Sequence, residues 1–244
     1  ILFLIILLNR PCINPSFFLS IILFEYMNYL TLIPARKNSK RIKNKNLIKI
    51  NGVSLIDRTI AAALKIKKKN FIIVSTDNEK ILSKSKKFNK KKIEFLKRPK
   101  YLSKDSSSIE SLVLNIIKNK FKNNKPKNII VLQPTSPFRN HKHINNCIKK
   151  FEKKKLDSIF SVYKDKLFLW NNHLKSLTYN YKKRENTQKM KKSLIENGAI
   201  FIFKTKKFLK LKNKRRIFGK FDYFEMQKKY SLDIDGPEDL KKNK

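Results

Sequence analysis

Short apolar runs alternate along this chain with longer stretches in which apolar residues recur every three or four positions. The short runs predict buried strands at residues 29–33, 71–75, 93–96, 129–133, 158–162 and 199–203. The periodic stretches predict helices at residues 55–65, 78–88, 107–119, 142–153 and 237–242. Asp77 or Asn78 can cap the second of these helices, and a serine of 106–108 can cap the third. Strands that alternate with helices are typical of a layered α/β domain.

The pattern is least regular between residues 163 and 195. This stretch is polar, with scattered aromatic residues such as Trp170, and it fits neither a strand nor a helix period. By itself, the pattern predicts a long surface loop.

The first 26 residues differ from the rest of the chain. Two apolar halves are separated by the polar segment 9–15, and neither half reaches the roughly 20 apolar residues that a membrane-spanning helix needs. We expect no membrane association, a true start at Met27, and residues 1–26 as a non-native upstream extension or an unstructured apolar leader; an interfacial anchor is the alternative. The folded domain is then expected at residues 27–244.

Composition limits the range of functions. The chain has 244 residues, 41% of them hydrophobic, which suffices for one substantial core, and a formal net charge of +41. The lysines are spread over the whole length and do not form a basic tail, so we expect no specific nucleic-acid partner, although a basic nucleic-acid-binding protein remains an alternative. The two cysteines, Cys12 and Cys147, suggest no disulfide framework, so a cytoplasmic location is expected.

The most informative stretch follows the first predicted strand. That strand stops at Pro34 and is followed by a polar, cation-rich loop. Its candidate phosphate-binding residues are Arg36, Asn38, Ser39, Lys40, Lys45 and Asn46. Backbone N–H groups and fixed cations after a strand are a common way to bind phosphates, so the loop predicts a phosphate site.

Further along the chain, a pair of acidic residues suggests a metal site. Asp233 and Asp235 are two positions apart in an extended segment, so both carboxylates face the same way and can converge on a hard cation. We expect Mg²⁺ (or Mn²⁺) there, together with phosphate oxygens of a substrate.

The chain resembles the acylneuraminate cytidylyltransferase family through six motifs in the family's order. They read Ile33-Pro-Ala-Arg-Lys-Asn-Ser-Lys40 with Lys45-Asn46, Val74-Ser-Thr-Asp77, Arg98-Pro-Lys-Tyr-Leu-Ser-Lys-Asp105, Leu132-Gln-Pro-Thr-Ser-Pro-Phe-Arg139, Glu196-Asn-Gly-Ala-Ile-Phe-Ile202 and Ser231-Leu-Asp-Ile-Asp235. The ordered set is far more specific than any single motif.

This resemblance implies a three-layer, Rossmann-like nucleotidyltransferase fold of the GT-A type with a mostly parallel sheet. It implies transfer of CMP from CTP to the anomeric hydroxyl of a nonulosonic (sialic-type) acid, with release of pyrophosphate, for surface glycan biosynthesis. In the family, the region around residues 163–195 protrudes and forms much of a homodimer interface, so a protruding dimerisation segment is expected.

The resemblance also implies roles for single residues. Catalytic roles are expected for Arg36, Lys45 and Asp235, and nucleotide binding also for Asn38, Ser39, Lys40, Asn46, Arg98, Ser108 and Gln133. The Gln133 carboxamide offers a donor and an acceptor to a base edge. Sugar binding is expected for Gln133, Gln188, Asn197 and Gly198.

One departure from the family pattern is at Thr187, and two alternative functions stay open. Thr187 stands where relatives have an arginine before the glutamine, and Arg184 could substitute from a shifted position. The alternatives are an octulosonate cytidylyltransferase, which ranks lower because Asn38-Ser-Lys-Arg41 lacks the usual Ser-Thr-Arg pattern, and an inactive homologue.

Overall fold

The computed structural model describes residues 27–37, 39–89, 91–184 and 186–241. The interpretation of residues 1–26 and the predicted nucleotide contact of Asn38 lie outside the described residues. No helix in the described part of the chain is long and apolar enough to cross a membrane.

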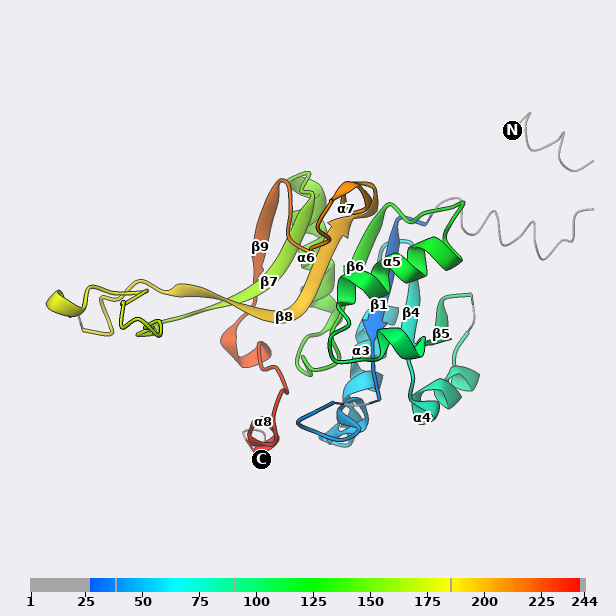
Figure 1. Cartoon of the computed structure of the whole chain (residues 1–244), viewed down its shortest axis with the longest axis horizontal. Coiled ribbons are helices and arrows are strands. Elements are labelled where there is room, and N and C mark those ends of the chain that lie inside the picture. The colour runs from blue at the N-terminus through cyan, green and yellow to red at the C-terminus, as the bar shows by residue number, and fades with distance from the viewer. Residues whose placement is uncertain (1–26, 38, 90, 185, 242–244) are drawn as a thin grey trace, which may run out of the picture.

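A seven-stranded sheet forms the middle of the molecule (Figure 1), in the order β5-β4-β1-β6-β8-β7-β9. The strands are β1 (Tyr29–Pro34), β4 (Asn70–Thr76), β5 (Ile93–Lys97), β6 (Asn128–Val131), β7 (Ser158–Asp165), β8 (Ser193–Lys204) and β9 (Phe221–Glu225). All pairs are parallel except the two that β8 makes with β6 and β7. The expected mostly parallel α/β sheet is therefore confirmed.

Helices cover both faces of this sheet. The helices are α3 (Leu55–Leu64), α4 (Glu79–Leu82), α5 (Ile109–Lys120), α6 (His141–Lys153), α7 (Thr205–Lys210) and α8 (Pro237–Lys241). Alternate side chains of β1 enter two different apolar clusters: Tyr29 and Ile33 join the cluster that includes α3 and α6, whereas Leu30 and Leu32 join the cluster that includes α5 and α7. Burial on both faces explains why β1 is apolar at every position but Thr31, and the two clusters give the predicted three layers.

Several elements differ from the sequence-based expectation. The predicted helix at 78–88 is only one α-helical turn, α4, followed by the 3₁₀ helix η2 (Ser83–Lys87), because the Ser/Lys-rich second half has no apolar stripe to bury. Strand β9 and helix α7 were not predicted, since their lysines and acidic residues mask the periodicity. The predicted caps are present: Asn78 accepts from the Lys80 N–H and Ser108 from the Ser111 N–H.

Short elements link these larger ones. The pair β2 (Lys49–Ile50) and β3 (Val53–Ser54) forms a hairpin whose turn residues, Asn51 and Gly52, both have positive φ. The 3₁₀ turns are η1 (Lys45–Leu47), η3 (Lys100–Leu102), η4 (Tyr181–Lys183) and η5 (Lys228–Tyr230).

Beyond the body of the sheet, the far ends of β7 and β8 continue into an arm that projects from the molecule (Figure 1). Residues 166–192 form its outer part, where Trp170 and Tyr179 pack edge to face and the Trp170 indole N–H donates to the Tyr179 hydroxyl at 2.8 Å. The Arg184 guanidinium lies over the Phe168 ring, with its carbon 4.4 Å from the ring centroid. The irregular stretch is thus a protrusion and not a loop folded onto the core; its role in dimerisation stays a prediction.

Candidate functional site

A cleft of about 300 Å³ opens where β1, β5 and β6 end. The carboxyl ends of parallel strands are the usual ligand-binding edge of an open α/β sheet. Residues from five separate segments line the cleft: Pro34, Arg36, Ser39, Lys45, Asn46, Arg98, Lys104, Asp105, Ser107, Ile109, Gln133, Pro134, Thr135, Asp233 and Asp235.

The loop after β1 is held in shape by polar contacts. The Lys37 N–H donates to the Asp77 carboxylate at 2.6 Å, which fastens the start of the loop to the end of β4. The Asn46 carboxamide donates to the Arg36 carbonyl at 2.9 Å and closes the loop on itself. Asn44 has a left-handed φ of 54°, which asparagine tolerates better than most residues. The loop therefore presents Arg36, Ser39 and Lys45 to the cleft from a fixed backbone.

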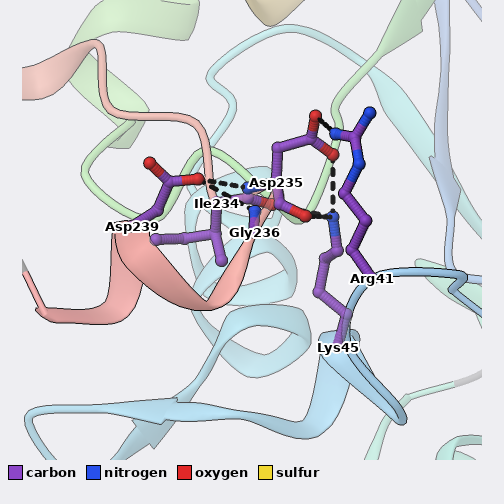
Figure 2. A network of polar contacts seen from close by, with 6 residues as sticks. All are labelled: Arg41, Lys45, Ile234, Asp235, Gly236 and Asp239. Carbon is purple, nitrogen blue, oxygen red and sulfur yellow. Dashed lines mark hydrogen bonds and ion pairs between the residues drawn. The ribbon is translucent and has the colours of Figure 1, made fainter.

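Lys45 connects this loop to the segment near the C-terminus (Figure 2). Its ammonium group donates to the carbonyls of Ile234 and Asp235 at 3.0 and 3.1 Å and to the Asp235 carboxylate at 3.2 Å. Its side chain is only 9% exposed, and desolvation lowers the Lys45 pKa, with Arg41 and Arg36 acting in the same direction and Asp233 opposing. A buried, hydrogen-bonded cation facing a cleft is well suited to stabilise negative charge on a ligand.

The carboxylates of Asp233 and Asp235 both border the cleft. Asp235 forms ion pairs with Arg41 and Lys45, and its backbone N–H, like that of Gly236, donates to Asp239 at 2.9 Å (Figure 2). The described residues include no cluster of three or more His, Cys, Asp or Glu side chains that could hold a metal ion by themselves. Two carboxylates with an open cleft beside them fit a Mg²⁺ ion that takes its other ligands from phosphates and water.

Arg98 follows β5 directly and lines the cleft. Its guanidinium donates to the Ser75 carbonyl at 3.2 Å, and the residue is buried. Burial lowers the pKa of Arg98 to about 10, with Arg36 acting in the same direction and Asp77 opposing. Arg98 therefore stays charged at neutral pH, and its orientation is fixed by the end of β4.

Gln133 follows β6, and a buried arginine fixes its backbone carbonyl. The buried Arg139 guanidinium donates to the Gln133 carbonyl at 2.8 Å and to the Ala199 carbonyl at 3.2 Å. Burial lowers the pKa of Arg139 to about 9. Gly198, with φ of +65°, lies beside the Gln133 carboxamide: a Cβ there would be 3.5 Å from Gln133 Nε2. Gln133 is thus placed by neighbours on both sides and borders the cleft.

Five predicted site residues in the described part of the chain are not among the residues that line the cleft: Lys40, Ser108, Gln188, Asn197 and Gly198. Lys40 is exposed and pairs with Asp105 at 3.4 Å, and Ser108 caps α5 one position away from the lining residues Ser107 and Ile109. Asn197 is buried, and its carboxamide donates to Ser231 at 3.0 Å and accepts from Ser161 at 2.6 Å.

Gln188 lies in the projecting arm, where its carbonyl accepts from Lys166 at 2.6 Å. The arm leads away from the body of the molecule (Figure 1). Within one chain, Gln188 is therefore apart from the cleft, and its predicted role in sugar binding would require a second chain.

Sequence reasoning missed four polar lining residues: Lys104, Asp105, Ser107 and Thr135. Asp105 ends the motif that begins at Arg98, so its type and position were visible, but its contact with Arg36 at 2.7 Å depends on how the loop between η3 and α5 folds back. The Thr135 carbonyl accepts from the Ile234 N–H at 2.8 Å. This contact joins the turn after β6 to the acidic segment, residues 233–235, which contains Asp233 and Asp235.

A family model described as cytidylyltransferase matches residues 30–244. The chain belongs to the cytidylyltransferase family. The match covers the whole cleft and confirms the family resemblance that the six motifs indicated.

Curated relatives agree with this family. The chain is 32% identical over 212 residues to N-acylneuraminate cytidylyltransferase A of Danio rerio, covering 84% of this chain and 47% of the relative. It is 29% identical over 218 residues to N-acylneuraminate cytidylyltransferase of Escherichia coli O18:K1:H7, covering 84% and 49%. The chain thus spans about half the length of these relatives.

The fold is similar to a solved structure of CMP:2-keto-3-deoxy-manno-octonic acid synthetase complexed with CTP. The TM-score is 0.61 at 17% identity, with 88% of this chain and 96% of the other covered. At this identity the likeness supports the fold alone.

Proposed function

We propose that this cytidylyltransferase-family chain transfers CMP from CTP to the anomeric hydroxyl of a nonulosonic acid and releases pyrophosphate. The observation that carries the proposal is that three kinds of functional residue line one cleft. They are the cations Arg36 and Lys45, the amide Gln133, and the acidic pair Asp233 and Asp235. The named relatives, N-acylneuraminate cytidylyltransferases, support both the nucleotide and the class of sugar acid.

In this proposal the sugar hydroxyl attacks the α-phosphorus of CTP, a new P–O bond forms, and the bond to pyrophosphate breaks. Arg36, Lys45 and the loop N–H groups stabilise the negative charge on the phosphoryl oxygens. Lys45 is held by carbonyls of the acidic segment, so it enters the reaction already oriented and largely desolvated. Arg98 and Gln133, which also line the cleft, orient the nucleotide.

Asp233 and Asp235 would hold Mg²⁺ or Mn²⁺. Such an ion, when bound, supplies charge neutralisation at the phosphates and lowers the pKa of a nearby hydroxyl. The described residues fit a site of this kind only with substrate oxygens completing it, so we expect metal binding to be tighter when CTP is present.

The sugar acid and the assembly are further parts of the proposal. The cleft holds no contribution from Gln188 of the same chain, which favours a homodimer in which one arm reaches the other chain's cleft. We expect the enzyme to act in the cytoplasm in surface glycan biosynthesis. Octulosonate is the alternative acceptor.

Pyrophosphate release from CTP and Mg²⁺ tests the proposal, with a panel of nonulosonic acids and octulosonate as acceptors. Release that depends on one nonulosonic acid supports the reaction and identifies the acceptor. Release only with octulosonate would replace the acceptor class, and absence of release across the panel from folded protein would reject the proposed activity.

A further inference from the structure

Asp105 forms ion pairs with two cations of the loop after β1. The Arg36 guanidinium lies 2.7 Å from Asp105 Oδ1, and the Lys40 ammonium lies 3.4 Å from Asp105 Oδ2. Asp105 comes from the loop between η3 and α5, while its two partners come from the loop that follows β1. One carboxylate therefore connects the loop after β1 to the loop between η3 and α5.

The proposed reaction assigns Arg36 to phosphate, and the sequence makes Lys40 a further candidate phosphate ligand. Arg36 and Asp105 both line the cleft, so the ion pair lies within the space that a triphosphate would enter. A carboxylate and a phosphoryl group both offer anionic oxygens to a guanidinium, and they compete for the same N–H donors. The Asp105 carboxylate thus takes the position of an anionic ligand.

We propose that Asp105 is a positioning residue that acts as an internal counter-ion of the triphosphate site. It holds Arg36 and Lys40 near the cleft in the absence of nucleotide and gives them up when the triphosphate binds. After the reaction, the same carboxylate competes with pyrophosphate for the two cations and favours its release. The inference rests on the proposed function, because it assumes that the loop binds phosphates.

The expected size of the effect is moderate. The side chains of Arg36, Lys40 and Asp105 are 35%, 77% and 42% exposed, so solvent screens both pairs. Exposed ion pairs of this kind change equilibria by small factors. Removing the carboxylate charge should therefore tighten the binding of a polyphosphate by about two- to fivefold.

The test is calorimetric binding of tripolyphosphate and of CTP, without divalent metal and at fixed ionic strength. Asp105→Asn removes the charge, and Asp105→Glu keeps it. Asp165→Asn is the matched control, since Asp165 pairs with Lys228 at 2.6 Å on β7 and does not line the cleft. We expect tighter binding of both ligands to Asp105→Asn, near wild-type binding to Asp105→Glu, and no change for Asp165→Asn.

A double-mutant cycle with Arg36→Ala separates a direct contact from a general charge effect. If Asp105 acts through Arg36, the gain from Asp105→Asn shrinks when Arg36 is already absent. Weaker or unchanged binding to Asp105→Asn, or an equal gain in both backgrounds, overturns the inference. Polyphosphate binding without pyrophosphate release from any acceptor would instead reject the proposed function and leave the counter-ion role supported.

Discussion

Substituting Asp235 with asparagine tests the contact between Lys45, in the loop after β1, and the segment that contains Asp233 and Asp235. The change removes the charge that pairs with Lys45 and Arg41 but keeps the size of the side chain. Lys45 retains two of its three acceptors, the carbonyls of Ile234 and Asp235, so its position should survive. We therefore expect a large loss of activity with little loss of stability.

The structure gives the size of both effects. The Asp235 side chain is 58% exposed, so its ion pairs contribute at most about 1 kcal/mol to folding. For a chain of this length that corresponds to a fall in Tm of no more than about 4 °C. Loss of one preorganised electrostatic group at a reacting phosphate typically lowers kcat by about 10²–10³-fold, or about 3–4 kcal/mol.

Pyrophosphate release under saturating CTP and Mg²⁺ measures the rate, and thermal denaturation measures the stability of the same preparation. Asp165→Asn serves again as the control for loss of one carboxylate charge outside the cleft. A rate within about threefold of wild type would refute the assignment of Asp235 to the reaction. A fall in Tm of about 10 °C or more would instead show that Asp235 is mainly structural.

Three further changes test other parts of the structure. Gln133→Ala should lower the preference for CTP over UTP in kcat/KM by about five- to a hundredfold, since base-edge partners lose their hydrogen bonds; an unchanged ratio would remove Gln133 from the base site. Gly198→Ala should cost about 1–2 kcal/mol in urea denaturation, because φ is +65° there while the space for a Cβ is adequate; equal stability would contradict this strain. Asp157 is buried, which opposes its ionisation, yet hydrogen bonds from Lys207, the Lys220 N–H and Lys204 lower its pKa from 3.8 to about 2. Its carboxylate thus contributes about 1–2 kcal/mol above pH 4, which is lost as the pH falls towards 2. Urea denaturation between pH 7 and pH 3 should show a smaller pH dependence in Asp157→Asn, and parallel curves would reject this contribution.

The sequence allowed the position of much of the cleft to be predicted, because its residues follow parallel strands. Residues after β1, β4 and β6 necessarily meet at one edge of the sheet, and Arg36 and Gln133 are placed by this rule. Asp233 and Asp235 could not be placed by strand order, since they follow the sheet in an irregular segment; the ordered motifs related them to the same site.

The remaining differences arise from long-range packing. Strand β8 runs antiparallel beside β6, and at its bend Asn197 turns inward to Ser161 and Ser231 while Gly198 lies against Gln133. The motif containing Asn197 and Gly198 was read as sugar-binding, and it gave no sign that neither residue lines the cleft. Likewise, the ion pair of Asp105 depends on a loop conformation that no local pattern encodes.

The contact between Lys45 and Asp235 joins residues that are 190 positions apart in the chain. During synthesis, the loop after β1 leaves the ribosome long before the segment that holds its buried lysine. The sheet can begin to assemble around β1, β4 and β6. The cleft, however, lacks the lining residues Asp233 and Asp235 until residue 235 has emerged. A nascent chain would therefore form its sheet before its cleft is complete, and under the proposed function binding of CTP would report that synthesis has passed this point.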